Sequence, residues 1–141
     1  MRKDYRFLAL FLFLFSTNLF AAHHGHAKLS DQMVRDYFNG WNSANIEKVM
    51  SYFSVDIVYE DVPKAQIAKG TDAVKAFVEQ FYIDFAGARL AVESVTIGTK
   101  GAAGEWIMSG GSGDEAWSVR GASIMEHKGG KISKVTDYWD K

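Results

Sequence analysis

Residues 118–141, SVRGASIMEHKGGKISKVTDYWDK, form one predicted structural unit at the end of the chain. Two runs with β-branched and aromatic residues flank His127-Lys128-Gly129-Gly130, a short loop in which glycine can adopt a positive φ without a steric clash. This pattern predicts an antiparallel β-hairpin. If the four-residue loop sets the pairing, Arg120 lies opposite Asp137 on a face that it shares with apolar residues. The hairpin therefore predicts a cation and a carboxylate that meet inside a pocket.

The composition limits the class of protein. The 141 residues are 48% hydrophobic with a single proline, which indicates one domain large enough to bury a core. The formal net charge is -1, whereas a protein that binds nucleic acid needs a basic patch to neutralise phosphates. No nucleic-acid partner is therefore expected. The absence of cysteine excludes disulfides and thiolate chemistry.

Residues 1–22 have the three parts of a secretory signal peptide. A positively charged start precedes a continuous apolar run, Phe7–Phe15, and Ala21-Ala22 supplies small residues for cleavage. The run is shorter than the ~20 residues that span a bilayer, and an uncleaved membrane anchor is the alternative. We expect cleavage at residue 22 or its neighbour, and a periplasmic or secreted protein without membrane contact afterwards.

Residues 23–28 are predicted to form a disordered tail, because they contain glycine and no apolar periodicity. The tail includes His23, His24 and His26, and imidazoles beside a free amine can chelate copper or nickel. Incidental histidines are the favoured interpretation, and no metal site is predicted.

Residues 29–141 are predicted to form a single α+β domain. Apolar residues at helical spacing predict three helices, near residues 33–41, 45–53 and 71–86. Alternating side chains predict three strands before the hairpin, at residues 55–62, 90–98 and 104–110. Thr71 is expected to cap the third helix, and Pro63 to end the first strand. The predicted fold packs helices on one side of a curved antiparallel sheet.

The hairpin sequence VRGASIMEHKGGKISKVTDYWD, together with VYEDVP at residues 58–63, resembles the SnoaL-like branch of the nuclear transport factor 2-like superfamily. The resemblance covers the chain from about residue 29 to its end. It implies a cone in which a curved antiparallel sheet packs on three N-terminal helices around a central apolar pocket. Superfamily members include ketosteroid isomerase, polyketide cyclases, limonene epoxide hydrolase, dehydratases and binding proteins without catalysis, and many are homodimers. The fold alone therefore fixes no reaction.

Similarity to ketosteroid isomerase implies two catalytic positions. Glu60-Asp61-Val62-Pro63 resembles the segment with the general base of that enzyme, which makes Asp61 the base here, and its oxyanion tyrosine falls on Tyr37. A carboxylate would remove a proton next to a carbonyl while the phenol stabilises the enolate oxygen. The second oxyanion donor of the isomerase falls on Ala122, whose methyl group cannot donate a hydrogen bond. The resemblance to a steroid isomerase is therefore incomplete.

Two other relatives imply different chemistry. The polyketide cyclases use an aspartate near the last strand, a role that Asp137 matches. Limonene epoxide hydrolase matches at Tyr59, Asp61 and Asp137. Its second carboxylate and its arginine align near Trp106 and Met108, which cannot activate water or protonate an epoxide. Epoxide hydrolysis is therefore not expected.

Several candidates also have a purely structural interpretation. Asp61 either lines the pocket, where desolvation would raise its pKa, or caps the turn at Pro63. Arg120 and Asp137 either form a structural ion pair or a site in which Arg120 holds an anionic group. Tyr37 is a core residue by default, and its match to the isomerase tyrosine is what favours a function. The residues predicted to contact the substrate are Tyr59, Trp106, Met108, Arg120 and Trp139.

Three functions compete at this point. The first is a small exported enzyme that needs no cofactor and acts on an apolar carbonyl compound as an isomerase, cyclase or dehydratase. Asp61 would be its base, Tyr37 its oxyanion donor and Asp137 a second acid or base. The second is a periplasmic protein that binds a small hydrophobic molecule without changing it. The third is an accessory protein that forms a homodimer through its outer sheet face.

Overall fold

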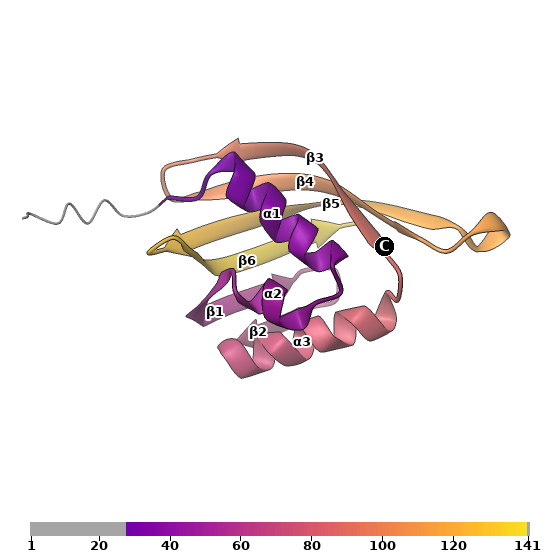
Figure 1. The fold of residues 1–141 in the computed structure, drawn as a ribbon, viewed down its shortest axis with the longest axis horizontal. Helices are drawn as coiled ribbons and strands as arrows, with labels where there is room; N and C mark the ends of the chain where they lie inside the picture. The colour runs from indigo at the N-terminus through magenta and orange to yellow at the C-terminus, as the bar shows by residue number, and fades with distance from the viewer. Residues whose placement is uncertain (1–27, 141) are drawn as a thin grey trace, which may run out of the picture.

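A computed structural model describes residues 28–140 (Figure 1). Its elements in chain order are α1 (Asp31–Asn42), α2 (Ile46–Met50), β1 (Phe53–Asp61), β2 (Gln66–Lys69), α3 (Thr71–Asp84), β3 (Arg89–Ile97), β4 (Gly101–Gly110), the 3-10 turn η1 (Gly113–Glu115), β5 (Trp117–Lys128) and β6 (Lys131–Trp139). The predicted signal peptide and the histidine-containing part of the tail, residues 1–27, lie outside the described residues. Within residues 28–140, no helix is long and apolar enough to cross a bilayer.

One curved, mixed sheet of six strands forms the centre of the fold, with the strand order β2-β1-β6-β5-β4-β3 (Figure 1). Neighbouring strands are antiparallel except β1 and β6, which are parallel. The predicted purely antiparallel sheet is wrong at this pairing, because the chain passes through α3 and three further strands before it returns beside β1. The prediction also lacks β2, an edge strand of four residues that is too short to show a clear alternation.

The hairpin of β5 and β6 turns over two residues and not over the predicted four. Gly129 and Gly130 have φ angles of 57° and 78°, and a two-residue hairpin turn commonly requires positive φ at both central positions. Lys128 and Lys131 still pair with each other across the turn, and His127 pairs with β6 as well. Two residues assigned to the loop therefore belong to β5.

The two-residue turn and an irregular pairing between Glu126 and His127 together change which side chains meet across the hairpin. Ser123, and not Arg120, lies opposite Asp137. The predicted pair of Arg120 and Asp137 is therefore wrong. Because side chains alternate between the two faces of a strand, a shift of three residues also moves Arg120 to the face opposite that of Asp137.

Local hydrogen bonds set where the helices begin. The side chain of Ser30 accepts a bond from a backbone N–H in the first turn of α1, and Asn45 does the same for α2. α3 has no such side-chain cap; it follows Gly70 directly. The hydroxyl of Thr71 donates instead to the backbone carbonyl of Val55, at 3.3 Å. The predicted cap by Thr71 is therefore wrong, because its hydroxyl ties α3 to β1.

The helices cover one face of the sheet, with α1 over β3 and β4 and α3 beside β1 and β2 (Figure 1). The close approach of α1 depends on Gly104 of β4, because a Cβ there would lie 2.6 Å from the ring of Phe38. The aromatic side chains of α1 and α3 consequently face the same inner side of the sheet, where the core lies.

Candidate functional site

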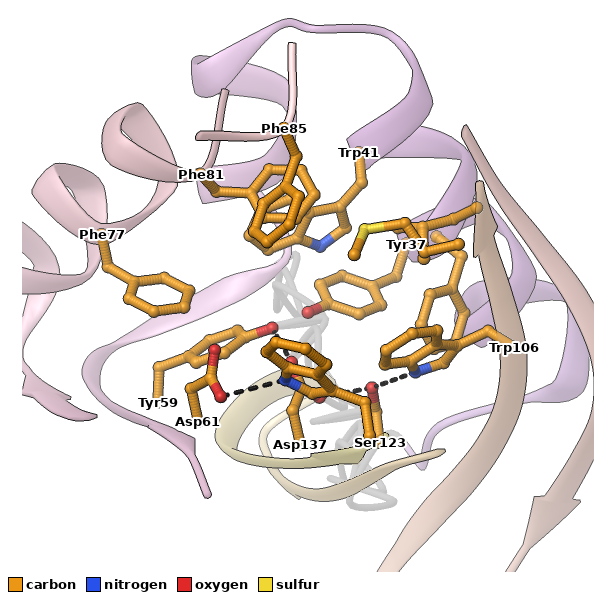
Figure 2. A pocket seen from close by; sticks show the side chains of 14 residues that line it. Tyr37, Trp41, Tyr59, Asp61, Phe77, Phe81, Phe85, Trp106, Ser123 and Asp137 are labelled. Carbon is orange, nitrogen blue, oxygen red and sulfur yellow. Dashed lines mark hydrogen bonds between the residues drawn. The ribbon is translucent and has the colours of Figure 1, made fainter. Parts of the chain in front are cut away.

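A cavity lies between the inner face of the sheet and the helices α1 and α3 (Figure 2). Its volume is about 40 Å³, which is room for about three waters. The helices contribute an aromatic wall to it, composed of Tyr37, Trp41, Phe77, Phe81 and Phe85. The first four of these residues lie in the apolar helical patterns that the sequence showed, and helical spacing alone could not separate cavity wall from core; Phe85 follows the end of α3.

Two carboxylates from neighbouring strands face this cavity. Asp61 ends β1 and pairs directly with Asp137 of β6 in the parallel ladder, so both side chains project to the same side of the sheet. Asp61 is 6% exposed, and Asp137 is half-buried. The structure therefore brings together Asp61 and Asp137, and the third predicted catalytic residue, Tyr37, lines the same cavity.

Both carboxyl oxygens of Asp137 accept hydrogen bonds (Figure 2). The Tyr59 hydroxyl donates to Oδ2, and the Ser123 hydroxyl donates to Oδ1 at 2.5 Å. Burial raises the pKa of Asp137 to about 6; the two hydrogen bonds oppose this increase, and the negative charge of Asp61 adds to it. A carboxyl group with a pKa close to neutrality can both accept and release a proton under physiological conditions.

Ser123 is a site residue that the sequence prediction missed. It is 2% exposed, and while its hydroxyl donates to Asp137 it accepts a bond from Nε1 of Trp106 at 2.9 Å. The available signal was strand alternation, since Ser123 shares the inner face with the buried Met125. Ala122, on which the second oxyanion donor of the isomerase was placed, lies on the outer face. The position next to it, Ser123, is the polar one that reaches the cavity.

Asp61 both lines the cavity and closes the turn at Pro63. Its Oδ1 accepts a bond from Nε1 of Trp139 at 3.0 Å inside the cavity, and also one from the backbone N–H of Lys64 at 3.2 Å. The second bond closes the turn that contains Pro63. The other oxygen, Oδ2, has no hydrogen-bond partner among the described residues. One oxygen of Asp61 is thus structural, and the other is free to meet a ligand.

Tyr37 contributes a buried hydroxyl to the cavity. The residue is 1% exposed, and its hydroxyl has no hydrogen-bond partner among residues 28–140. Figure 2 shows the hydroxyl directed into the cavity, near that of Tyr59. Burial and then the charge of Asp137 raise the pKa of Tyr37, so the hydroxyl keeps its proton at neutral pH. The same two causes raise the pKa of Tyr59. Tyr37 is therefore available as a hydrogen-bond donor.

The predicted substrate contacts divide into two groups. Trp106 and Met108 are buried and line the cavity together with the half-buried Trp139. Arg120 lies on the outer face of the sheet, where its exposed guanidinium is 3.5 Å from the carboxylate of Glu105. The predicted placement of Arg120 in the pocket is therefore wrong.

Within residues 28–140, no three side chains of the metal-binding types His, Cys, Asp or Glu are grouped to hold a metal ion. The histidines at positions 23, 24 and 26 lie outside the described residues.

The sequence also matches the profile of a known protein family. The profile of the SnoaL-like domain matches residues 34–135. The chain belongs to the SnoaL-like domain family. This result confirms the family that the hairpin and the VYEDVP segment had indicated. No curated protein matches this SnoaL-like chain at a significant level.

Solved structures share the fold of this SnoaL-like protein. One is a hypothetical protein from Catenulispora acidiphila with a ketosteroid isomerase-like fold, in complex with trimethylamine (TM-score 0.70, 14% identity, 78% of this chain and 86% of that chain covered). Another is a candidate ketosteroid isomerase from Kribbella flavida (TM-score 0.65, 23% identity, 77% and 75% covered). A third is a candidate SnoaL-like polyketide cyclase from Jannaschia (TM-score 0.67, 13% identity, 77% and 83% covered). At these identities the similarity shows the fold alone.

Proposed function

We propose that this SnoaL-like protein binds a small, mostly apolar molecule in its cavity and transfers a proton on it without a cofactor. The observation that carries this proposal is the direct pairing of Asp61 with Asp137 inside an aromatic cavity. A carboxyl group buried beside a second carboxylate keeps its proton to a higher pH, as the pKa of about 6 for Asp137 shows, and can serve as the proton donor. The trimethylamine in the Catenulispora relative supports a small-molecule site in this fold.

Each polar group of the cavity has a distinct proposed role. Asp61 is the base, because its Oδ2 has no partner among the described residues. Tyr37 donates a hydrogen bond to an oxygen atom of the ligand and stabilises the charge that develops there. Asp137 supplies or receives the second proton with its pKa of about 6. Depending on the ligand, such a proton shift leads to isomerisation, cyclisation or dehydration.

A binding protein without catalysis is the second candidate. It is favoured by the hydrogen bonds of Asp137, whose two oxygens already accept bonds from Tyr59 and Ser123. These bonds occupy one acceptor site on each oxygen and hold the carboxyl group against other protein side chains, as a structural role would require.

Exchange of hydrogen for deuterium next to the carbonyl of small ketones such as butanone, followed by NMR in heavy water, tests the proposal. We expect the parent protein to catalyse exchange and Asp61→Asn to lose on the order of 100-fold or more of the rate while keeping its affinity. The matched control is Asp114→Asn, at an exposed position in η1, which should retain the parent rate. Equal rates in Asp61→Asn and the parent would reject Asp61 as the base. Binding of the ketones without exchange in the parent would favour the binding protein.

We also propose that the protein is exported to the periplasm or secreted, and that it forms a homodimer. The positively charged start and the apolar run at residues 7–15 support export. The exposed side chains of Ile124 and Tyr138 on the outer sheet face support association of two copies. A full-length mass for the protein from the native host would contradict cleavage, and a monomer at all concentrations in sedimentation would contradict the dimer.

A further inference from the structure

The cavity holds negative charge without a described positive charge to balance it. Asp61 and Asp137 both face the cavity, and none of its described lining residues is lysine, arginine or histidine. The ammonium of Lys64 lies 4.7 Å from the ring centre of Phe85, a residue of the cavity wall, but it pairs with Asp84 at 3.2 Å. Carboxylates enclosed among apolar groups without a cation cost free energy, and a positively charged ligand would offset that cost.

The rest of the wall also favours a cation. Rings of tryptophan, tyrosine and phenylalanine attract cations to their faces. Three of them follow one another along the wall: the ring centres of Trp41 and Tyr59 are 6.1 Å apart, and those of Tyr59 and Phe77 are 4.6 Å apart. An anion would instead meet two carboxylates and the negative faces of these rings.

The hydroxyl of Tyr37 is a separate sign that a polar ligand belongs in this space. It is almost fully buried and directed into the cavity, and it has no partner among the described residues (Figure 2). A hydroxyl can accept as well as donate a hydrogen bond. It can therefore accept one from an N–H of a ligand beside the carboxylates.

We infer that the natural ligand of this cavity carries a positive charge and is a small organic ammonium compound held between the two carboxylates and the aromatic wall. The inference rests on the proposed small-molecule function and adds the charge class of the ligand. Room for about three waters limits the natural ligand to a few non-hydrogen atoms.

Three compounds of five non-hydrogen atoms each separate charge from size: tert-butylammonium, tert-butyl alcohol and propionate. Binding is followed through the indole N–H signals of Trp41, Trp106 and Trp139 in the NMR spectrum, with Trp117, which is not a lining residue, as the reference signal. At about pH 8 we expect the ammonium to bind about tenfold more tightly than the alcohol, or better, and propionate to bind most weakly. Sodium chloride at equal ionic strength is the blank.

The pH dependence supplies a check that needs no variant. The titratable groups that face Asp137 are Tyr37 from α1 and Tyr59 and Asp61 from β1; α3 and β4 contribute apolar and aromatic side chains, and β5 contributes Ser123. Near pH 5 the proton gained by Asp137 removes its attraction for a cation. The affinity for the ammonium should then fall several-fold, whereas the affinity for the alcohol should stay constant.

Asp137→Asn removes the charge and keeps the shape, so the preference for the ammonium should shrink several-fold, while Asp114→Asn should keep the parent preference. If Asp137→Asn does not fold, Asp61→Asn tests the same point. Equal or tighter binding of the alcohol to the parent protein would overturn this inference and leave the proposed function standing. If none of the three compounds shifts the indole N–H signals of the cavity, both this inference and the proposed function are overturned. The same holds if the Trp117 signal shifts as much as the signals of the cavity indoles.

Discussion

Tyr37 is at once a core aromatic residue and a buried hydroxyl without a partner. Its ring packs edge-on against Phe38 and Phe53, with ring centres 5.1 and 5.7 Å away. The hydroxyl does not stabilise the fold. It is an unpaired buried polar group, and such a group costs free energy. The ring therefore serves the fold, and the hydroxyl has a use only when a ligand is bound.

Tyr37→Phe should separate these two parts of the side chain. We expect the free energy of unfolding to stay the same or to rise by up to about 1 kcal/mol, because an unsatisfied group is removed from the core. Exchange on small ketones should fall roughly 100-fold, as for the loss of one oxyanion donor. Urea unfolding and the NMR exchange assay measure the two effects.

The matched control is Tyr82→Phe. The Tyr82 hydroxyl donates to the backbone carbonyl of Trp41 at 2.9 Å, outside the set of groups that point into the cavity. Its loss should lower stability by about 1 kcal/mol and leave the exchange rate close to that of the parent. A Tyr37→Phe variant that loses stability but keeps its activity would show that the hydroxyl is structural.

Among elements, the strands were easier to predict than the way they pair. The alternation in residues 55–62 puts Ile57, Tyr59 and Asp61 on one face of the strand, and all three are buried on the inner face of the sheet. The face of Asp137 relative to β5 depended instead on the irregular pairing between Glu126 and His127, which adds one residue to β6. A two-residue turn in place of a four-residue one shifts the pairing by two residues and keeps the same face, whereas the added residue reverses it. Nothing in the local sequence marks this irregularity, because it depends on long-range packing of the inner face.

Parallel pairing of β1 with β6 could not be predicted from either strand alone. The two strands are separated by more than half of the described chain, and their contact depends on the packing of α3 and β3–β5. This pairing is nevertheless what sets Asp61 beside Asp137. Family resemblance supplied Asp61, Tyr37 and Asp137 as separate positions, and the sheet topology supplies their proximity.

A glycine in β5 makes room for the cavity wall. A Cβ at Gly121 would lie 2.4 Å from the Trp106 ring and 2.7 Å from the backbone oxygen of Tyr138. Gly121→Ala should therefore push the Trp106 indole away from Ser123 and lower the free energy of unfolding by about 1–3 kcal/mol. Urea unfolding gives the stability, and the indole N–H signal of Trp106 reports the lost hydrogen bond.

Gly98→Ala provides the comparison, because a Cβ at Gly98 meets only the backbone oxygen of Gly101, at an ordinary contact distance of 3.5 Å. This variant should stay within about 0.5 kcal/mol of the parent. If Gly121→Ala is as mild as Gly98→Ala and leaves the Trp106 signal in place, the tight fit around that indole does not hold in solution.

At the scale of the whole molecule, the site makes the protein less stable at neutral pH than it would otherwise be. The pKa of Asp137 rises from 3.8 to about 6 on folding, so the folded state binds this proton more tightly than the unfolded chain does. The stability that this tighter proton binding contributes is fully present below pH 3.8 and is lost as the pH increases through about 6. A shift of this size corresponds to about 3 kcal/mol.

Asp137→Asn should remove this pH-dependent loss. We expect the variant to be more stable than the parent by about 1–3 kcal/mol above about pH 7, and the gain to vanish near pH 4, where the carboxyl group of the parent is protonated. Urea unfolding at several pH values measures it, with Asp114→Asn as the exposed control that shows no such trend. A uniform loss of stability at every pH would mean that the bonds from Tyr59 and Ser123 outweigh the cost of burying the charge. A gain limited to high pH would instead show that the cavity keeps a costly carboxylate that the fold does not need, which is the expected signature of a site retained for a ligand.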